Sequence, residues 1–275
     1  MTHPAIAAGH TAVITGGASG IGLAAAKAYL QRGLKVAIAD WNDDALSAAR
    51  SALGPEALAV KADVSRREDV EALRDAVLDR FGAVHVLMNN AGIGNGGPAL
   101  GVLADWQRVL GTNLYGVVNG VQVFGPLMIA SGAPGLIINT GSKQGITTPP
   151  GDTAYNVSKA GVKVLTEALQ HELRSIEGGK VEAKLLIPGF VWTGLTTGGR
   201  AEKPAGAWTP EQTIDFMLAS IERGDFYILC PDNEVARATD EKRILWAAGD
   251  IAENRPPLSR WHKDYGDAFK AFLNS

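Results

Sequence analysis

Seven short apolar runs rich in β-forming residues alternate along this 275-residue chain with segments that have helical spacing. Repeated alternation of this kind predicts parallel strands joined by right-handed crossovers. The expected fold is therefore α/β, with one doubly wound, mostly parallel seven-stranded sheet flanked by helices on both faces. The predicted strands, each expected to be buried, are 11–15, 35–39, 57–61, 84–89, 135–140, 181–187 and 226–230.

The segment 65–81 shows the helical pattern most clearly. Ser65 and Glu68 have the spacing of a capping box, which would satisfy the first free backbone N–H groups of a helix. Gly82 suits the C-terminal end of that helix. The apolar residues expected on its buried face are Val70, Leu73, Val77 and Phe81.

Two segments fall outside the alternation of strands and helices. Residues 191–209 are rich in Gly, Thr, Pro and Trp, and we expect a mobile substrate loop there. Residues 237–275 carry several aromatic side chains and are expected to form a C-terminal extension that packs on the sheet or on another subunit. Because no linker or change of composition divides the chain, residues 1–275 are predicted to form a single domain.

Composition and charge exclude several classes of protein. A net charge of −3 and a pI of about 6.0 give no basic surface for nucleic acid. No apolar run reaches the length of about 18 residues that a membrane span needs. The segment Met1–His10 lacks the pattern of a signal peptide. Cys230 is the single cysteine, so the chain has no internal disulfide, and a reducing, cytoplasmic setting is expected.

Other polar residues give no sign of a metal centre. The histidines do not have the spacing of metal ligands, so no metal site is predicted. Cys230 ends an apolar run and is expected in the core. The mixed-sign run 240–243 is expected on a solvated helix face. The histidines concerned are His3, His10, His85, His171 and His262.

A glycine-rich loop follows the first predicted strand and leads directly into a helix expected at about 21–31. Binding of a pyrophosphate requires close approach of the backbone and a helix N-terminus directed at the phosphates. Gly16 can make the tight turn, while Gly20 and Gly22 remove side chains where phosphate and sheet come close. The position between strand and helix predicts a Rossmann-type dinucleotide site rather than glycines that serve only as turns. The loop reads Thr15-Gly16-Gly17-Ala18-Ser19-Gly20-Ile21-Gly22.

Asp40 ends the second predicted strand and bears on the choice of cofactor. A carboxylate there suits the adenosine ribose hydroxyls of NAD. It would repel the 2′-phosphate of NADP by up to about 4 kcal/mol at ~4 Å and an effective dielectric constant of ~20. Neither Ala18 nor Trp41 supplies a compensating cation. NAD(H) is therefore preferred, although NADP(H) stays open if Arg or Lys comes from elsewhere, and Asp40 could instead cap the next helix.

Two short motifs follow the third and fourth predicted strands. Asp63-Val64 comes after the third strand, and Asn89-Asn90-Ala91-Gly92 comes after the fourth. In open α/β sheets, ligands bind outside the carboxyl ends of the strands. Each motif taken alone also fits an ordinary turn.

Three residues of the second half suggest a proton-transfer site. Tyr155 and Lys159 are four residues apart in a helical segment, so they share one face, and Ser142 follows the fifth predicted strand. A phenol with a pKa near ~10 is a weak base at neutral pH. A nearby ammonium and an oxidised nicotinamide would lower that pKa, so that Tyr155 could exchange a proton with a substrate oxygen. Ser142 could hydrogen-bond the same oxygen.

Together these motifs resemble those of the short-chain dehydrogenases/reductases, over about residues 11–230. Thr15–Gly22 resembles the TGxxxGxG loop, and Asn89–Gly92 matches the NNAG motif. Ser142, Tyr155 and Lys159 match the catalytic Ser and the YxxxK motif. Residues 188–193 match the PGxVxT segment. Gly141 stands where the family often has a second Ser, and the chain beyond Cys230 is longer than the family needs.

The resemblance implies further roles. Asn113 corresponds to the Asn that holds a proton-relay water, and Lys159 would also bind the nicotinamide ribose. Val191 and Thr193 would contact the carboxamide, and a homodimer or homotetramer is expected. The implied cofactor-binding residues are Gly16, Ser19, Gly20, Ile21, Gly22, Asp40, Asp63, Val64, Asn90, Ala91, Gly92, Tyr155, Lys159, Pro188, Gly189, Val191 and Thr193.

The leading functional hypothesis is therefore an oxidoreductase that interconverts a secondary alcohol and a ketone. A non-catalytic dinucleotide sensor on the same fold would be expected to lack Tyr155 or Lys159. An epimerase or dehydratase would need a larger substrate domain than the ~45 residues after Cys230. Gln144, Phe190 and Trp192 are predicted to line the substrate pocket, which suggests an apolar or bulky substrate.

Overall fold

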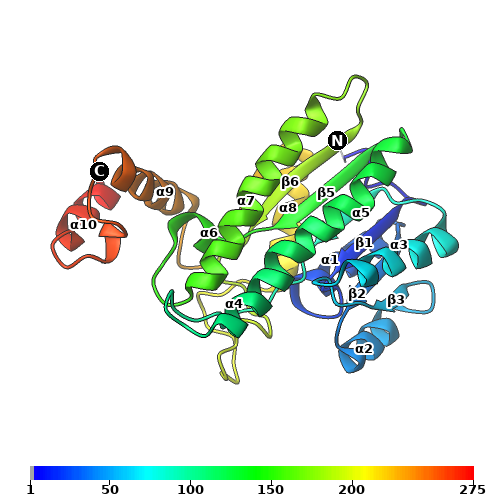
Figure 1. Ribbon diagram of the computed structural model, residues 1–275, viewed down its shortest axis with the longest axis horizontal. Coiled ribbons are helices and arrows are strands. Elements are labelled where there is room, and N and C mark those ends of the chain that lie inside the picture. The colour runs from blue at the N-terminus through cyan, green and yellow to red at the C-terminus, as the bar shows by residue number, and fades with distance from the viewer. Residues whose placement is uncertain (1–2) are drawn as a thin grey trace.

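Residues 3–275, which the computed structural model describes, contain a seven-stranded parallel sheet with the order β3-β2-β1-β4-β5-β6-β7 (Figure 1). All six strand pairings are parallel, which confirms the predicted doubly wound fold. The strand order reverses between β1 and β4, where open sheets of this class form their ligand crevice. The strands are β1 (Thr11–Thr15), β2 (Lys35–Asp40), β3 (Leu58–Lys61), β4 (Val86–Asn89), β5 (Gly135–Thr140), β6 (Val181–Ile187) and β7 (Tyr227–Leu229).

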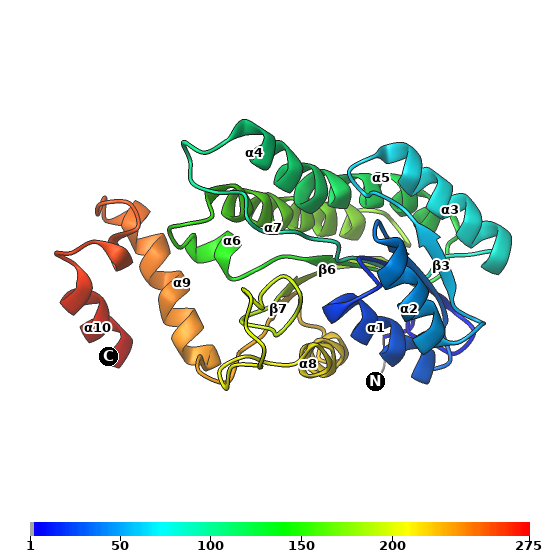
Figure 2. The same cartoon turned by 90° about the horizontal axis from the view of Figure 1, so that it is seen from below.

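Helices cover the two faces of the sheet in separate layers, which Figure 2 shows from the side. One layer contains α1 (Gly20–Gln31), α2 (Asp43–Leu53) and α8 (Pro210–Glu222). The other contains α3 (Arg67–Phe81), α4 (Leu103–Leu110), α5 (Gly116–Ala130) and α7 (Thr153–Arg174).

Alternation along the central strands supplies both halves of the core. Ile14, Met88 and Ile138 are fully buried against the α1 side of the sheet. Their chain neighbours Val13, Leu87 and Ile137 are fully buried against the α3 side. Successive side chains of a strand point to opposite faces, so strands covered on both faces become continuous apolar runs. Those runs are the feature by which the sequence predicted the sheet.

Two local expectations need correction. The capping box at Ser65 does not form, because the Ser65 hydroxyl donates to Asp63 Oδ1 at 2.7 Å and α3 begins only at Arg67. At the other end Gly82 is left-handed and its N–H bonds Leu78 O at 2.8 Å, as predicted. The third strand is half-buried rather than buried, since β3 is an edge strand with β2 as its one neighbour.

The segment predicted as a substrate loop is closed at its base by backbone pairing. Trp192 N donates to Trp208 O at 2.8 Å, and Trp208 N donates to Phe190 O at 2.8 Å. The chain between these residues forms an irregular loop beside the carboxyl ends of the strands. Its mobility stays a prediction.

The C-terminal extension stands off one end of the sheet (Figures 1 and 2). It contains α9 (Arg237–Ala252), a short 3₁₀ turn (Ser259–Trp261) and α10 (Gly266–Asn274). Trp246 packs edge-on against Phe269, and its indole N–H donates to Ser259 Oγ at 2.8 Å. The extension thus has a small core of its own, and it meets the body of the chain through α9 and α6 (Gln144–Thr147) rather than by covering the sheet.

Within residues 3–275, no helix has both the length and the apolar character needed to cross a membrane. No three His, Cys, Asp or Glu side chains of that range gather closely enough to hold a metal ion. Cys230 is fully buried, as predicted for a core residue. Of the segment Met1–His10, residues 1 and 2 lie outside the described residues.

Candidate active site

A cavity of about 710 Å³ opens at the carboxyl ends of the central strands. It spans the point between β1 and β4 where the strand order reverses. Most of the residues predicted for the site line it, although they come from segments far apart in the sequence. Those residues are Gly16, Ser19, Gly20, Ile21, Asp40, Asp63, Val64, Asn90, Ala91, Gly92, Ser142, Tyr155, Lys159, Pro188, Gly189, Val191 and Thr193.

The glycine-rich loop forms a tight cradle at the start of α1. Gly16 has a φ of +62°, and a Cβ there would lie 2.7 Å from Ala91 Cα. A Cβ on Gly22 would lie 2.2 Å from Gly16 O, so this residue packs beneath the loop instead of lining the cavity. The N-terminal end of α1 faces the cavity with unpaired N–H groups and the positive end of its dipole. This arrangement suits a pyrophosphate.

Asp40 lies at the adenosine end of the predicted site and is not a helix cap. Its Oδ2 accepts from Ala18 N at 3.3 Å, which ties the carboxylate to the glycine-rich loop. Asn42 caps α2 instead, accepting from Ala45 N at 3.0 Å. The alternative role considered for Asp40 is therefore wrong.

Positive charges near Asp40 are engaged elsewhere. Lys61 is the register neighbour of Asp40 on β3, but its ammonium pairs with Asp43. Among the described residues that line the cavity, the cations are Arg108 and Lys159. Lys159 is held at the end of β5, and β1 and β4 lie between β5 and β2. Arg108 donates to Asn95 O at 3.1 Å, in the segment after β4, so neither cation of the cavity lining pairs with the carboxylate.

Tyr155 and Lys159 lie one turn apart on α7, as the spacing predicted. Asp152 begins this helix and accepts from Tyr155 N at 3.4 Å. The Lys159 side chain is buried, and its ammonium donates to Thr140 O at 2.8 Å. Nζ lies 5.8 Å from the centre of the Tyr155 ring. Ser142, which follows β5, shares the cavity with both residues.

The buried environment shifts the pKa values of both Tyr155 and Lys159. Burial raises the pKa of Tyr155, hydrogen bonding by Ser142 opposes this effect, and Asp152 adds to it. Burial also lowers the pKa of Lys159 to about 8. The lowering of the Tyr155 pKa by the Lys159 ammonium together with an oxidised nicotinamide stays a prediction, since the protein residues alone shift this pKa upward. Both charged forms lose hydration in the same buried site.

The Lys159 shift predicts a pH-dependent difference in stability. Because the folded chain releases this proton at about pH 8 and the unfolded chain near 10.5, folding stability rises with pH between those values. Lys159→Met removes this titration. Between pH 8 and 10.5, the unfolding free energy of the wild type should therefore rise by about 3 kcal/mol relative to that of the variant. This figure uses roughly 1.4 kcal/mol per pKa unit. Denaturant unfolding of both proteins at several pH values measures this, and a constant difference would contradict it.

Asn113 lies behind the cavity, in a single π-helical turn (Gly111–Tyr115) between α4 and α5. It is fully buried, and its side chain exchanges two hydrogen bonds of 2.8 Å with the backbone of Ile93. A Cβ on Gly92 would lie 3.6 Å from both Asn113 Oδ1 and Lys159 Nζ, which places these two side chains near each other. Such π-turns occur often at functional sites.

The three residues predicted for the substrate pocket do not line the cavity. Gln144 is exposed at the start of α6. Phe190 and Trp192 pair through their backbones with Trp208 at the base of the loop. The cavity is also lined by residues that the sequence analysis did not select, among them Ile93, Gly94, Asn95, Arg108, Thr112 and Leu195.

Some of these missed residues had a signal in the sequence. Gly94 and Asn95 continue the segment after β4. Because ligands bind at the carboxyl ends of the strands, these two residues could have been selected as well. Arg108 and Thr112 precede Asn113 on the same helical stretch, and helical spacing gives no indication of which face meets the cavity. Leu195 belongs to an irregular loop, for which no pattern exists.

Comparisons with known proteins agree with this geometry. The family model described as short chain dehydrogenase matches residues 10–204. An oxidoreductase named SadH from Mycobacterium tuberculosis is 41% identical over 215 residues, which are 77% of each chain. A 3beta-hydroxysteroid dehydrogenase 2 from Eggerthella lenta is 34% identical over 74% of this chain and 79% of its own.

A solved structure resembles this chain over nearly its full length. It is a short-chain dehydrogenase/reductase from Burkholderia phymatum in complex with NAD, with 34% identity and a TM-score of 0.83. The match covers 94% of this chain and 98% of that protein. With the family model spanning more than half of the sequence, the chain belongs to the short-chain dehydrogenase/reductase family.

Proposed function

We propose that this protein is an NAD-dependent oxidoreductase that interconverts a secondary alcohol and a ketone. The observation that carries the proposal is the convergence of Ser142, Tyr155 and Lys159 on one cavity with the glycine cradle of α1. A nicotinamide dinucleotide, when bound, supplies or accepts the hydride and in its oxidised form adds a positive charge beside Tyr155.

The residues present fit that dinucleotide. The close approaches at Gly16 and Gly22 leave no space for side chains, and the N-terminal end of α1 suits the phosphates. Asp40 would accept hydrogen bonds from the ribose hydroxyls, which favours NAD over NADP. The NAD bound to the related Burkholderia protein supports the same choice. Asp63 and Val64 would border the adenine, Asn90 the adenosine ribose side, and Val191 and Thr193 the carboxamide.

The catalytic roles follow from position and chemistry. Tyr155 would give a proton to the substrate oxygen during reduction and take it back during oxidation. Ser142 would hydrogen-bond that oxygen and stabilise its developing charge. Lys159 would bind the nicotinamide ribose and keep a positive charge near Tyr155. Asn113 would hold the loop at Ile93 and a proton-relay water beside Lys159.

An apolar or bulky substrate is the proposed class. Ile93 and Leu195 give the cavity an apolar part, while Asn95, Arg108 and Thr112 give it a polar part. The relative named as a 3beta-hydroxysteroid dehydrogenase supports a bulky secondary alcohol. A homodimer or homotetramer and a cytoplasmic setting stay predictions.

A cofactor-linked substrate screen tests the proposal. Purified protein is incubated with aliphatic, aryl and steroidal alcohols and ketones, with NAD(H) and with NADP(H) in parallel, and absorbance of the reduced nicotinamide is followed. We expect turnover of at least one apolar alcohol–ketone pair, faster with NAD(H). Tight NADH binding without turnover of any compound would favour a dinucleotide sensor, and preference for small charged substrates would contradict the substrate class.

A further inference from the structure

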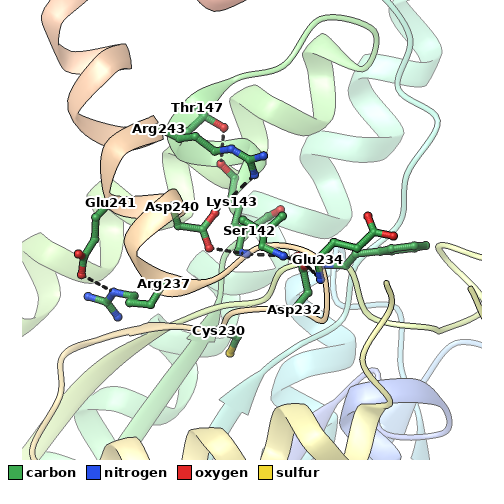
Figure 3. Close-up of polar contacts among 12 residues, drawn as sticks. Ser142, Lys143, Thr147, Cys230, Asp232, Glu234, Arg237, Asp240, Glu241 and Arg243 are labelled. Carbon is green, nitrogen blue, oxygen red and sulfur yellow. Dashed lines mark hydrogen bonds and ion pairs between the residues drawn. The ribbon is translucent and has the colours of Figure 1, made fainter. Parts of the chain in front are cut away.

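A buried cluster of charges lies directly behind Ser142 (Figure 3). The next residue, Lys143, places its ammonium 3.3 Å from Asp232 Oδ2 and 2.5 Å from Asp240 Oδ2. The two carboxylate side chains are only 7% and 5% exposed. Asp240 thus lies in the protein, and the expectation that the run 240–243 is a solvated helix face is wrong at its first residue. We call Lys143, Asp232 and Asp240 the Lys143 cluster.

The cluster joins the turn after β5 to two later segments of the chain, the nearer of which is 89 residues away. Lys143 belongs to the turn after β5 that carries Ser142, and its backbone N–H donates to Pro188 O at 3.4 Å. Asp232 follows β7 and accepts from Phe190 N at 3.3 Å, at the base of the substrate loop. Asp240 lies in the first turn of α9 and comes from the C-terminal extension.

Gly189 shows how closely these segments pack. A Cβ on this residue would lie 2.7 Å from Asp232 Oδ2 and 2.8 Å from Lys143 Nζ. Gly189 also lines the cavity. The ion pair therefore lies against the backbone of the cavity wall, and a shift of either partner would move that wall.

The cost of burying these charges indicates that the Lys143 cluster fixes the positions of the segments that carry it. Charges removed from water cost several kcal/mol each unless they are paired and hydrogen-bonded. Burial raises the pKa of Asp240, and Lys143 and Arg243 oppose that rise. Asp232 is fixed further by accepting from Val235 N at 2.8 Å. A buried pair of this kind adds little stability, but it holds its partners in one arrangement.

We infer that the Lys143 cluster positions Ser142 and the base of the substrate loop, so that the C-terminal extension supports the site through Asp240. The inference rests on the proposed function for the role of Ser142. Lys143 and Asp240 are positioning residues, because they act on the substrate oxygen only through Ser142. The extension contributes through Asp240 although its residues do not line the cavity.

Asp240→Asn tests the inference with little change of shape. Loss of the charge should let the Ser142 turn shift, which lowers kcat by about 10- to 100-fold, since misplacement of about 1 Å can cost that much. The Kd for NADH should change far less than kcat, because Asp40 and the glycine cradle at α1 are untouched. Asp250→Asn is the matched control, because Asp250 pairs with Arg255 at 3.0 Å inside the extension and is similarly buried. It should leave kcat unchanged.

A double-mutant cycle separates positioning from general damage. If Asp240 acts through Ser142, Asp240→Asn should have almost no further effect on kcat in a Ser142→Ala background. Lys143→Met should show the same dependence on Ser142. Additive losses in the cycle, or loss of NADH binding by Asp240→Asn through global unfolding, would overturn the inference.

Amide hydrogen exchange gives a readout that needs no substrate. Asp240→Asn should speed exchange in residues 141–147 and at Phe190, whereas Asp250→Asn should not. Unchanged exchange there would overturn the inference even in an active enzyme. Absence of turnover in the wild-type protein would contradict the proposed function. The exchange data would still decide whether the extension controls the Ser142 turn.

Discussion

Replacing Tyr155 by Phe should lower kcat by about 10²- to 10⁴-fold, the range over which a positioned general acid–base contributes. The hydroxyl is the one group of this side chain that can exchange a proton, and the Phe ring fills the same space on α7. The Kd for NADH should change little, because the cradle at α1 and the Lys159 side chain are untouched. Steady-state kinetics with NADH titration measure both quantities.

The matched control for this variant is Tyr227→Phe. Tyr227 lies on β7, and its hydroxyl bonds Glu167 at 2.5 Å, away from the residues that line the cavity. Its loss should leave kcat unchanged. If Tyr155→Phe is as active as the wild type, proton transfer does not pass through this phenol and the proposed mechanism fails.

Replacing Asp40 by Ala should raise the ratio of kcat/KM for NADP to that for NAD by about 10²- to 10³-fold. The carboxylate repels a 2′-phosphate by up to about 4 kcal/mol at ~4 Å and an effective dielectric constant of ~20. It also accepts from ribose hydroxyls that only NAD presents, so the variant should lose activity with NAD while it gains activity with NADP. Parallel kinetics with both cofactors give the ratio.

Asp44→Ala is the control for the change in net charge. Asp44 lies in the first turn of α2 and is exposed, but it does not line the cavity. Its removal should shift the ratio far less than removal of Asp40. Equal shifts in the two variants would mean that long-range charge, and not contact with the ribose, sets the preference.

The fold could be predicted because its signals are local. Strands buried on both faces read as apolar runs, and β1 and β5 begin and end at the predicted residues. Helical spacing put Tyr155 and Lys159 on one face, and Ser142 together with the upstream glycine-rich loop singled the pair out. Ser65 shows the limit of such patterns, because its hydroxyl donates to Asp63 and α3 begins two residues later, at Arg67.

The electrostatics of the site could not be predicted in the same way. Spacing placed an ammonium near a phenol, but the pKa of each group depends on burial, which shifts both against ionisation. The residues selected for the substrate pocket do not line the cavity, for a related reason. Phe190 and Trp192 were selected for their place beside the nicotinamide segment, whereas backbone pairing with Trp208 determines what faces the cavity.

Long-range contacts were beyond any local pattern. Lys143 and Asp232 are 89 residues apart, and the run that begins at Asp240 was expected on a solvated helix face. Only the fold shows that the residue after Ser142 is held by the C-terminal extension.

Titration of the Tyr155 phenol tests most directly whether Lys159 and an oxidised nicotinamide together make it acidic. Phenolate absorbance is followed against pH for wild type and Tyr155→Phe, with and without NAD⁺, and the difference between the proteins isolates this residue. We predict a pKa above the ordinary 10.0 without NAD⁺ and below it when NAD⁺ is bound. A value that NAD⁺ leaves unchanged, or raises, would contradict proton transfer through Tyr155 near neutral pH.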